Sequence, residues 1–228
     1  MNCFSKIRNK LIFIYRRYIL REPFLLQISR WFKDKGDETL RLDYPLTQES
    51  IVFDVGGYNG DFAAELSNRF DCKIYIFEPV TEFYQRCVTR FQNNTKITCF
   101  NFGLSSTNGW LNIGLAENAS SFSSPHAKGL TQKVQIRSIV ECIQELDILK
   151  IDLMKINIEG GEFDVLPAII KSGDIAKIHY LQLQFHNFVN NANVLRADIR
   201  NQLEHTHSEM WNYEFVWESW KLKVASLE

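Results

Sequence analysis

Short apolar runs rich in β-branched residues alternate along this chain with segments whose apolar positions recur at helical spacing. The runs predict strands near 51–55, 73–78, 96–102, 153–158 and 178–185, and the spaced segments predict helices near 61–69, 80–92, 138–146, 162–171 and 194–206. Regular alternation of this kind predicts one mostly parallel sheet with helices on both faces. In such α/β folds a ligand binds in the crevice beyond the carboxyl ends of the strands.

Two segments depart from the alternation. Residues 213–223 are aromatic and alternate with period two, which predicts an antiparallel hairpin at the sheet edge. Residues 108–133 contain a short strand candidate at 110–115 and then a serine-rich loop. A loop this long in a compact domain is usually functional, so residues 116–133 are expected to form a lid that places Ser120 and Ser121 near an acceptor molecule.

The amino terminus has a different pattern. Residues 6–35 hold nine Lys or Arg but only two acidic residues, and an apolar stripe recurs there at helical spacing: Leu11, Ile14, Tyr15, Tyr18 and Ile19. The apolar run is too short to cross a bilayer, and no signal-peptide cleavage site follows it. Residues 1–46 are therefore predicted to be a basic helical appendage to a domain over 47–228. Two interpretations stay open: a helix packed on that domain, or attachment to an anionic membrane surface.

Composition narrows the functional classes. A chain of 228 residues that is 45% hydrophobic can bury one substantial core. A net charge of -1 gives no electrostatic reason to expect a nucleic-acid partner. The five cysteines are scattered without zinc-type spacing, so reduced thiols, a cytoplasmic location and no metal site are predicted.

The most informative motif joins a glycine loop to an acid. The apolar run 51–55 ends in the loop 56–60, and the next apolar run delivers Glu78, placed to accept hydrogen bonds from ribose hydroxyls. The loop lacks the GxGxxG spacing that cradles a pyrophosphate. Asp54 would repel a pyrophosphate but would suit an ammonium and a sulfonium. These features favour S-adenosylmethionine as the ligand.

A second polar cluster lies in residues 153–162. If strand 153–158 continued in extended form, Lys155, Asn157 and Glu159 would share one face, because side chains alternate along a strand. Burying them is costly unless they meet a ligand or each other. A structural ion pair between Lys155 and Glu159 is the alternative to a functional site.

Five motifs together resemble the FkbM family of methyltransferases: Val52–Gly60, Phe77–Pro79, Asn101–Ser105, Ser120–Ser121 and Lys155–Glu162. The resemblance runs from about Gln48 to Lys223. It implies a Rossmann-like, seven-stranded class I methyltransferase fold and, commonly, O-methylation of a hydroxyl on a sugar or natural product. The chain departs from the family pattern at two positions, because Asn157 stands where Asp is usual and Gln184 where Glu is common.

The resemblance also implies site residues. The cofactor would bind at Asp54, Gly56, Gly57, Tyr58, Asn59, Gly60, Glu78, Pro79, Asn101 and Phe102, with Phe102 also explicable as core. The acceptor would contact Ser120, Ser121 and Glu162.

Methyl transfer to a hydroxyl needs alignment and a proton acceptor. His186, Glu159 and Glu162 are the candidate bases, and His186 is favoured because histidine titrates near neutral pH. Lys155 is expected to orient or balance charge, and Asn157 to stand in for a carboxylate as a neutral hydrogen-bonding group.

Three functions remain open at this stage. The favoured one is a cytoplasmic O-methyltransferase acting on a sugar, glycan or natural product. The second is a methyltransferase acting on a protein or lipid group at a membrane surface. The third is a module that binds the cofactor without turnover.

Overall fold

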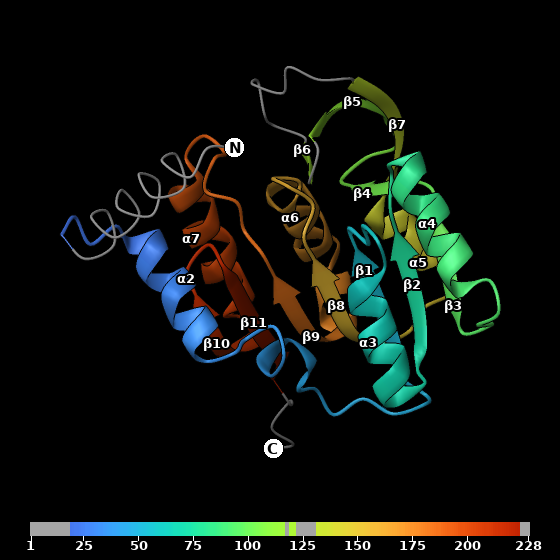
Figure 1. The fold of residues 1–228 in the computed structure, drawn as a ribbon, viewed down its shortest axis with the longest axis horizontal. Helices are drawn as coiled ribbons and strands as arrows, with labels where there is room; N and C mark the ends of the chain where they lie inside the picture. The colour runs from blue at the N-terminus through green and yellow to red at the C-terminus, as the bar shows by residue number, and fades with distance from the viewer. Residues whose placement is uncertain (1–18, 117–118, 122–130, 224–228) are drawn as a thin grey trace, which may run out of the picture.

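The computed structural model describes residues 19–116, 119–121 and 131–223 and contains the predicted parallel sheet (Figure 1). Five strands run parallel, and β11 pairs antiparallel with both of its neighbours. The seven strands lie in the order β10 (His207–Tyr213), β11 (Trp217–Leu222), β9 (Ile178–Leu183), β8 (Ile151–Ile156), β1 (Ile51–Val55), β2 (Lys73–Phe77) and β3 (Ile97–Phe100). The predicted strands therefore form one sheet, with β8 at its centre and β1 beside it.

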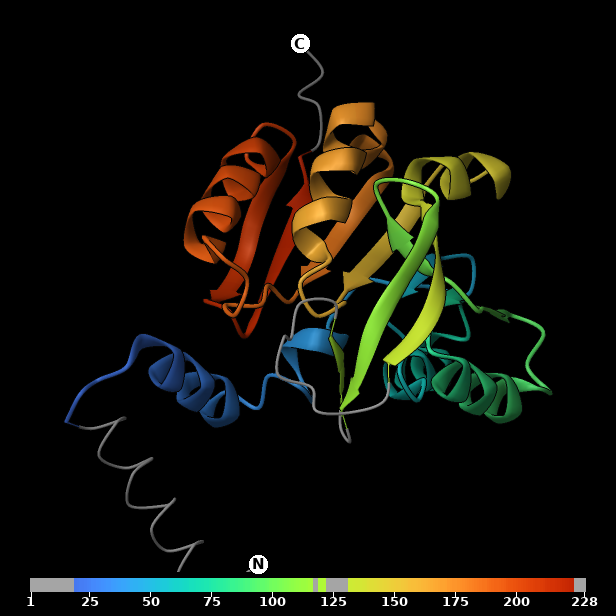
Figure 2. The same ribbon diagram turned by 90° about the horizontal axis from the view of Figure 1, so that it is seen from above.

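Helices cover both faces of this sheet, as predicted (Figure 2). One face carries α3 (Asp61–Phe70) and α4 (Thr81–Phe91), and the other carries α5 (Ile139–Glu145), α6 (Glu162–Ser172) and α7 (Ala192–Leu203). The larger core cluster lies on the α5–α7 side and contains the fully buried Phe53, Ile156 and Trp220. This rigid scaffold holds the carboxyl ends of β1, β2, β8 and β9 at a common edge.

The short strand expected at 110–115 is confirmed as β5 (Gly109–Ala116), and with its neighbours it forms a second sheet; residues 117–118 and 122–130 of the expected loop lie outside the described residues. The strands of this second sheet lie in the order β4 (Gly103–Ser105), β7 (Thr131–Ser138), β5 and β6 (Ala119–Ser121). Ile113 and Val134 bury one face of it against Val80 and Phe83. The prediction missed β7 because its apolar positions, Val134 and Ile136, are surrounded by polar residues on the exposed face.

The edge hairpin is present but longer than predicted, because β10 begins at His207 rather than near Tyr213. Polar residues fill the first half of β10, so its sequence pattern is not that of a buried strand. His207 is itself buried, and its Nε2 lies 2.9 Å from the carbonyl oxygen of Ile178.

The amino-terminal segment packs against the same sheet. Helix α2 (Pro23–Lys33) buries Trp31 against Tyr213 and Trp217, and the 3-10 turn η1 (Leu40–Leu42) follows it. Tyr44 reaches the sheet, with its hydroxyl 2.9 Å from that of Ser219. Most of the predicted stripe from Leu11 to Ile19 lies outside the described residues, and the domain boundary at 46/47 stays a prediction. Within the described ranges no helix is long and apolar enough to cross a membrane.

Candidate active site

The glycine loop that follows β1 brings two backbones into contact. Gly56 has φ +87°, and a Cβ atom there would lie 2.0 Å from the carbonyl oxygen of Asn157. Only glycine fits this conformation at this distance. The loop closes through a hydrogen bond from the Gly60 amide to the Gly57 carbonyl, 2.8 Å long, and α3 begins at the next residue. The amide end of that helix therefore faces the crevice.

Glu78 lies directly after β2 and is almost fully buried. Its Oε2 accepts the amide of Tyr58 at 2.8 Å, and its Oε1 accepts the amide of Val80 at 2.9 Å. Burial raises the pKa of Glu78 to about 7, although these two backbone donors act in the opposite direction. Each carboxylate oxygen can accept a second hydrogen bond, so Glu78 can hold the loop and still accept from ribose hydroxyls.

Asp54 and Lys155 form a buried ion pair between neighbouring strands. The Lys155 Nζ donates to Asp54 Oδ1 at 2.9 Å and to the Gly56 carbonyl at 2.6 Å. This pair corrects the expectation that Asp54 presents an uncompensated charge at the mouth of the loop. It supports the charge-balancing role predicted for Lys155, and it excludes the alternative pairing of Lys155 with Glu159, whose carboxylate lies beside His186 instead.

On the β2–β3 side, Asn101 and Phe102 follow β3 as predicted. The Asn101 side-chain amide donates to the carbonyls of Glu78 and Pro79, at 3.1 and 3.2 Å. Phe102 joins the aromatic core cluster through Phe77 and Phe100. Asn101 therefore fixes the turn that carries Glu78, and Phe102 is core, as the sequence allowed.

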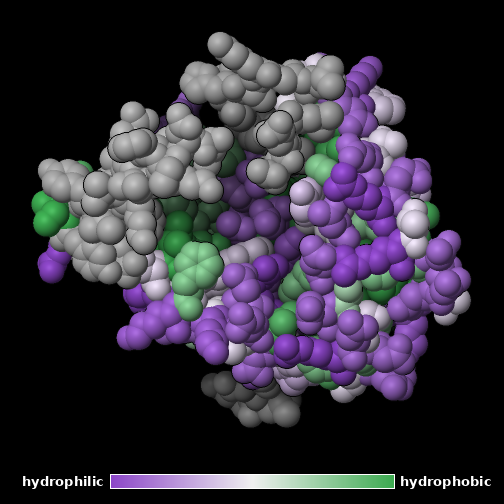
Figure 3. All heavy atoms as spheres, in the orientation of Figure 1, coloured by the Kyte–Doolittle hydropathy of each residue, from purple (hydrophilic) through white to green (hydrophobic). Residues whose placement is uncertain are grey.

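A pocket of about 250 Å³ opens beside the loop. Figure 3 shows a hollow lined by hydrophilic side chains near the centre of this face. The pocket is lined by the loop residues Gly56, Gly57, Tyr58 and Asn59, by Asp61, Phe62 and Glu65 of α3, by Lys155 and Asn157, and by Asp37, Arg41 and Leu42. The last three were not predicted, because no local pattern marks them; only the fold brings residues 37–42 to β9 and α3.

The loop residues Tyr58 and Asn59 also have structural partners. Tyr58 packs edge to face on Phe83, with ring centroids 4.6 Å apart. The Asn59 Oδ1 accepts from Arg86 at 3.0 Å.

Ser120 and Ser121 belong to β6, but their side chains and most of residues 116–133 lie outside the described residues. The lid over residues 116–133 therefore stays a prediction.

The polar cluster after β8 is arranged differently from the expectation of one extended face. The strand ends at Ile156, and Glu159 adopts a left-handed conformation with φ +53°. The cause is Glu162, whose fully buried carboxylate accepts the amides of Ile158 at 2.7 Å and Gly160 at 2.9 Å. The chain therefore folds back over the first turn of α6. Lys155 and Asn157 still line the same pocket, but Glu159 does not join them.

His186, which follows β9, lies between two carboxylates. Its Nδ1 is 3.2 Å from Glu162 Oε1, and its Nε2 is 3.5 Å from Glu159 Oε1. Burial lowers the pKa of His186, but hydrogen bonds to Glu159 and Glu162 outweigh it and raise the pKa to about 9. With a pKa of about 9, His186 is an imidazolium at neutral pH, which disfavours the free-base role expected for it; the identity of the base stays a prediction. Glu159 is the most exposed of the three side chains, at 27%, and is the one that an acceptor can reach.

These residues fit the expected cofactor. Asp54 Oδ2 and Asn157 Oδ1 are buried without hydrogen-bond partners, which indicates polar groups that a ligand could satisfy. The pocket offers acids for an ammonium or sulfonium and cations for a carboxylate, and Glu78 offers acceptors for a ribose. Among the described residues no group of His, Cys, Asp or Glu is arranged to hold a metal ion.

The fold and this edge of the sheet define a class I methyltransferase, and comparison with known proteins identifies the family. The model of the methyltransferase FkbM domain matches residues 54–216, more than half of the chain. The chain belongs to the FkbM methyltransferase family, and its cofactor is S-adenosylmethionine.

A solved structure agrees on the fold. SMU.1697c of Streptococcus mutans, described as a candidate methyltransferase and solved in complex with S-adenosylhomocysteine (SAH), is similar with a TM-score of 0.53. It is 11% identical, and the match covers 84% of this chain and 97% of that one. A Clostridium thermocellum protein described as an rRNA-methylase matches with a TM-score of 0.49 and 7% identity, over 84% and 97% of the two chains. No curated protein matches the sequence.

Proposed function

We propose that this methyltransferase transfers the methyl group to a hydroxyl oxygen of a sugar, a glycan or a small natural product. The observation that carries the proposal is the cluster of Glu159, His186 and Glu162 at the carboxyl ends of β8 and β9. A buried carboxylate fixes an imidazolium, and the imidazolium positions a second carboxylate that solvent reaches. Such a cluster suits an acceptor whose proton must leave.

Different residues would have different roles in the reaction. Bound S-adenosylmethionine supplies an electrophilic methyl group on a sulfonium, so the protein needs only to align the nucleophile and take its proton. Glu159 would accept the hydroxyl proton as the methyl group passes from sulfur to the hydroxyl oxygen, which leaves S-adenosylhomocysteine and the methyl ether, and His186 would hold Glu159 in place. Asn157 can donate a hydrogen bond to the hydroxyl oxygen or accept one from the hydroxyl group. It cannot take the hydroxyl proton at neutral pH.

The test is methyl transfer from labelled S-adenosylmethionine to a panel of nucleotide sugars, oligosaccharides, hydroxylated natural products and primary amines. We expect label on a hydroxyl compound, with loss of about 10²-fold or more in turnover for Glu159→Gln and unchanged cofactor affinity. Asn157→Asp is the matched variant, which restores the family's usual residue and should keep or raise turnover. Label on amines alone, or full activity of Glu159→Gln, would overturn the proposal.

A lipid or protein acceptor at a membrane is the second candidate. Ile19, Leu20 and Phe32 are 68%, 54% and 69% exposed, and the same segment carries Arg30 and Lys33. Apolar side chains beside basic ones favour an anionic lipid surface. The same labelled assay with vesicles containing phosphatidylglycerol decides between the two. Transfer that occurs only with vesicles would favour the membrane acceptor.

A further inference from the structure

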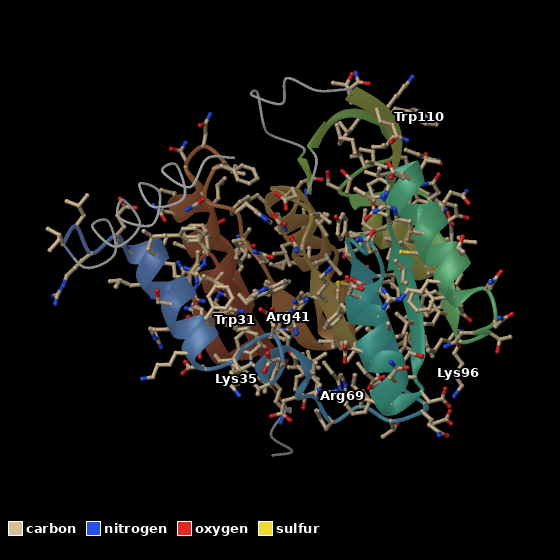
Figure 4. All side chains as sticks on the ribbon, viewed as in Figure 1. Trp31, Lys35, Arg41, Arg69, Lys96 and Trp110 are labelled. Atoms are coloured by element: carbon tan, nitrogen blue, oxygen red, sulfur yellow. The ribbon has the colours of Figure 1, made fainter. Side chains whose placement is uncertain are left out.

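The amino-terminal segment places a cation at the pocket. Arg41, in η1, lies in front of the strands between α2 and α3 (Figure 4). Its guanidinium stacks on the Trp217 ring at 4.2 Å and lies 5.2 Å from the Phe62 ring. Its Nε donates to Gln182 at 3.1 Å, and that amide is fully buried on β9. Arg41 is therefore held in one orientation before any ligand binds.

The guanidinium of Arg41 keeps a donor group with which it can bind an anionic ligand. Among the described residues Arg41 makes one ion pair, with Asp37, through Nη1 at 3.1 Å; the side chains of Arg41 and Asp37 are 19% and 53% exposed. Solvent around the exposed Asp37 carboxylate screens this pair, so it contributes little. In the part of the chain that the structure describes, no group accepts a hydrogen bond from Nη2 of Arg41. A planar guanidinium with a free donor edge matches a carboxylate.

The other cation that lines the pocket, Lys155, is already paired with a buried carboxylate. Lys155 lies in the same lining, but Asp54 neutralises it at 2.9 Å in a pair whose side chains are 5% and 0% exposed. A ligand carboxylate that approached Lys155 would compete with Asp54 in a buried setting. Arg41 is thus the better partner for an anionic group in this pocket.

The remaining charges fit the rest of an amino acid. Asp61 and Glu65 of α3 line the pocket, and Asp61 also pairs with Arg90 at 2.6 Å; Asp37, the partner of Arg41, lines it just before η1. These carboxylates can attract an ammonium and a sulfonium, while Arg41 takes the opposite charge. The pocket therefore carries the charge pattern complementary to the zwitterionic methionine part of the cofactor.

We propose that Arg41 binds the α-carboxylate of S-adenosylmethionine, and that Gln182, Trp217 and Phe62 hold Arg41 ready for it. The amino-terminal segment is then part of the cofactor site and not only a covering of the sheet. The proposal rests on the cofactor and is independent of which acceptor is methylated.

The test compares two ligands, SAH and its decarboxylated analogue, by titration calorimetry. We expect Arg41→Gln to weaken SAH binding by about 10-fold to 100-fold, the usual loss for a charged hydrogen bond. The same change should alter the affinity for the decarboxylated analogue by less than about twofold, because that ligand offers nothing for Arg41 to bind. Arg41→Lys, which keeps the charge but not the planar fork, should retain part of the preference for SAH.

The matched control is Arg69→Gln. Arg69, near the end of α3, also contacts the amino-terminal segment, through the Glu38 carbonyl at 3.5 Å, but it does not line the pocket (Figure 4). It should leave both affinities unchanged. If Arg41→Gln weakens both ligands equally, or neither, Arg41 only secures the segment and the proposal is overturned. A wild-type protein that binds SAH but methylates no hydroxyl would overturn the proposed acceptor and leave this proposal standing.

Discussion

The two sides of the active-site edge are held in place by different kinds of interaction. On the cofactor side, around β1 and β2, Asp54 and Glu78 are buried and hold backbone amides or a lysine. On the acceptor side, after β8 and β9, Glu159 and His186 are partly exposed and hold each other. The first side is fixed by the backbone of the sheet, whereas the second is fixed by charges that depend on one another. Cofactor binding should therefore tolerate changes of the acceptor-side charges better than turnover does.

The largest effect should come from the residue that joins the acceptor side to the scaffold. Glu162→Gln removes one of the two carboxylate oxygens that accept the amides of Ile158 and Gly160, and it removes the charge beside His186. A buried amide left without a partner costs about 1–3 kcal/mol, so the free energy of unfolding should fall by about 3 kcal/mol once the lost charge is included. Urea denaturation measures this change.

Glu159→Gln is the matched control for that experiment, because Glu159 contacts the same histidine but is 27% exposed. An exposed pair contributes at most about 1 kcal/mol, so this variant should unfold near the wild-type midpoint. Equal losses in the two variants would show that the buried carboxylate does not organise the turn.

A second prediction concerns the charge of His186. Its folded pKa of about 9 lies above the ordinary value of 6.5, so the stabilisation is complete below pH 6.5 and is lost as pH rises through 9. Wild type should be more stable than His186→Gln by roughly 2–3 kcal/mol at pH 6, and the difference should vanish near pH 10. Thermal or urea denaturation across that range checks the direction.

The pH dependence of turnover separates the two roles of His186. If the imidazolium positions Glu159, kcat should be flat from pH 7 to 8 and fall as pH passes about 9. If neutral His186 were the base, kcat would instead rise about tenfold per pH unit up to the same pKa. A rising limb that Glu159→Gln leaves intact would restore the assignment made from sequence.

The smallest expected effect is on the cofactor side. The pKa of Glu78 is about 7. If Glu78 accepts from ribose hydroxyls, as the sequence predicts, its ionised form is the better acceptor. Affinity for SAH should therefore fall about tenfold between pH 8 and pH 6, as the carboxyl group takes up a proton. In Glu78→Gln the affinity should be weaker at pH 8 and nearly independent of pH. A wild-type affinity that is constant over this range would exclude a direct contact between Glu78 and the ribose.

The comparison of the two sides also explains what could be predicted from the sequence. The loop 56–60 and Glu78 are close in sequence and follow strands with clear apolar patterns, so local rules placed them correctly. The arrangement of Glu159 could not be predicted, because Glu162 forces a turn where the alternating pattern implied a continuing strand. The pKa of His186 depends on two carboxylates 24 and 27 positions earlier in the chain, which no periodicity records.

The second sheet and the contribution of Arg41 escaped prediction for a related reason. Strand β7 buries Val134, Ile136 and Ser138, and only the first two are apolar, which leaves a weak apolar signal. Arg41 meets Gln182 across 141 positions of sequence. Contacts of that range follow from the order of strands in the sheet, and that order is a property of the whole fold.

The long reach of the amino-terminal segment has a consequence for the order in which the molecule assembles. Trp31, Arg41 and Tyr44 are synthesised more than 130 residues before their partners Gln182, Tyr213, Trp217 and Ser219. The glycine loop and β2 can associate long before those partners are made, since their contacts span few residues. Translation must therefore pass Trp217 before Arg41 can take its place in the pocket, and a nascent chain holds only the other walls of the pocket until β11 emerges.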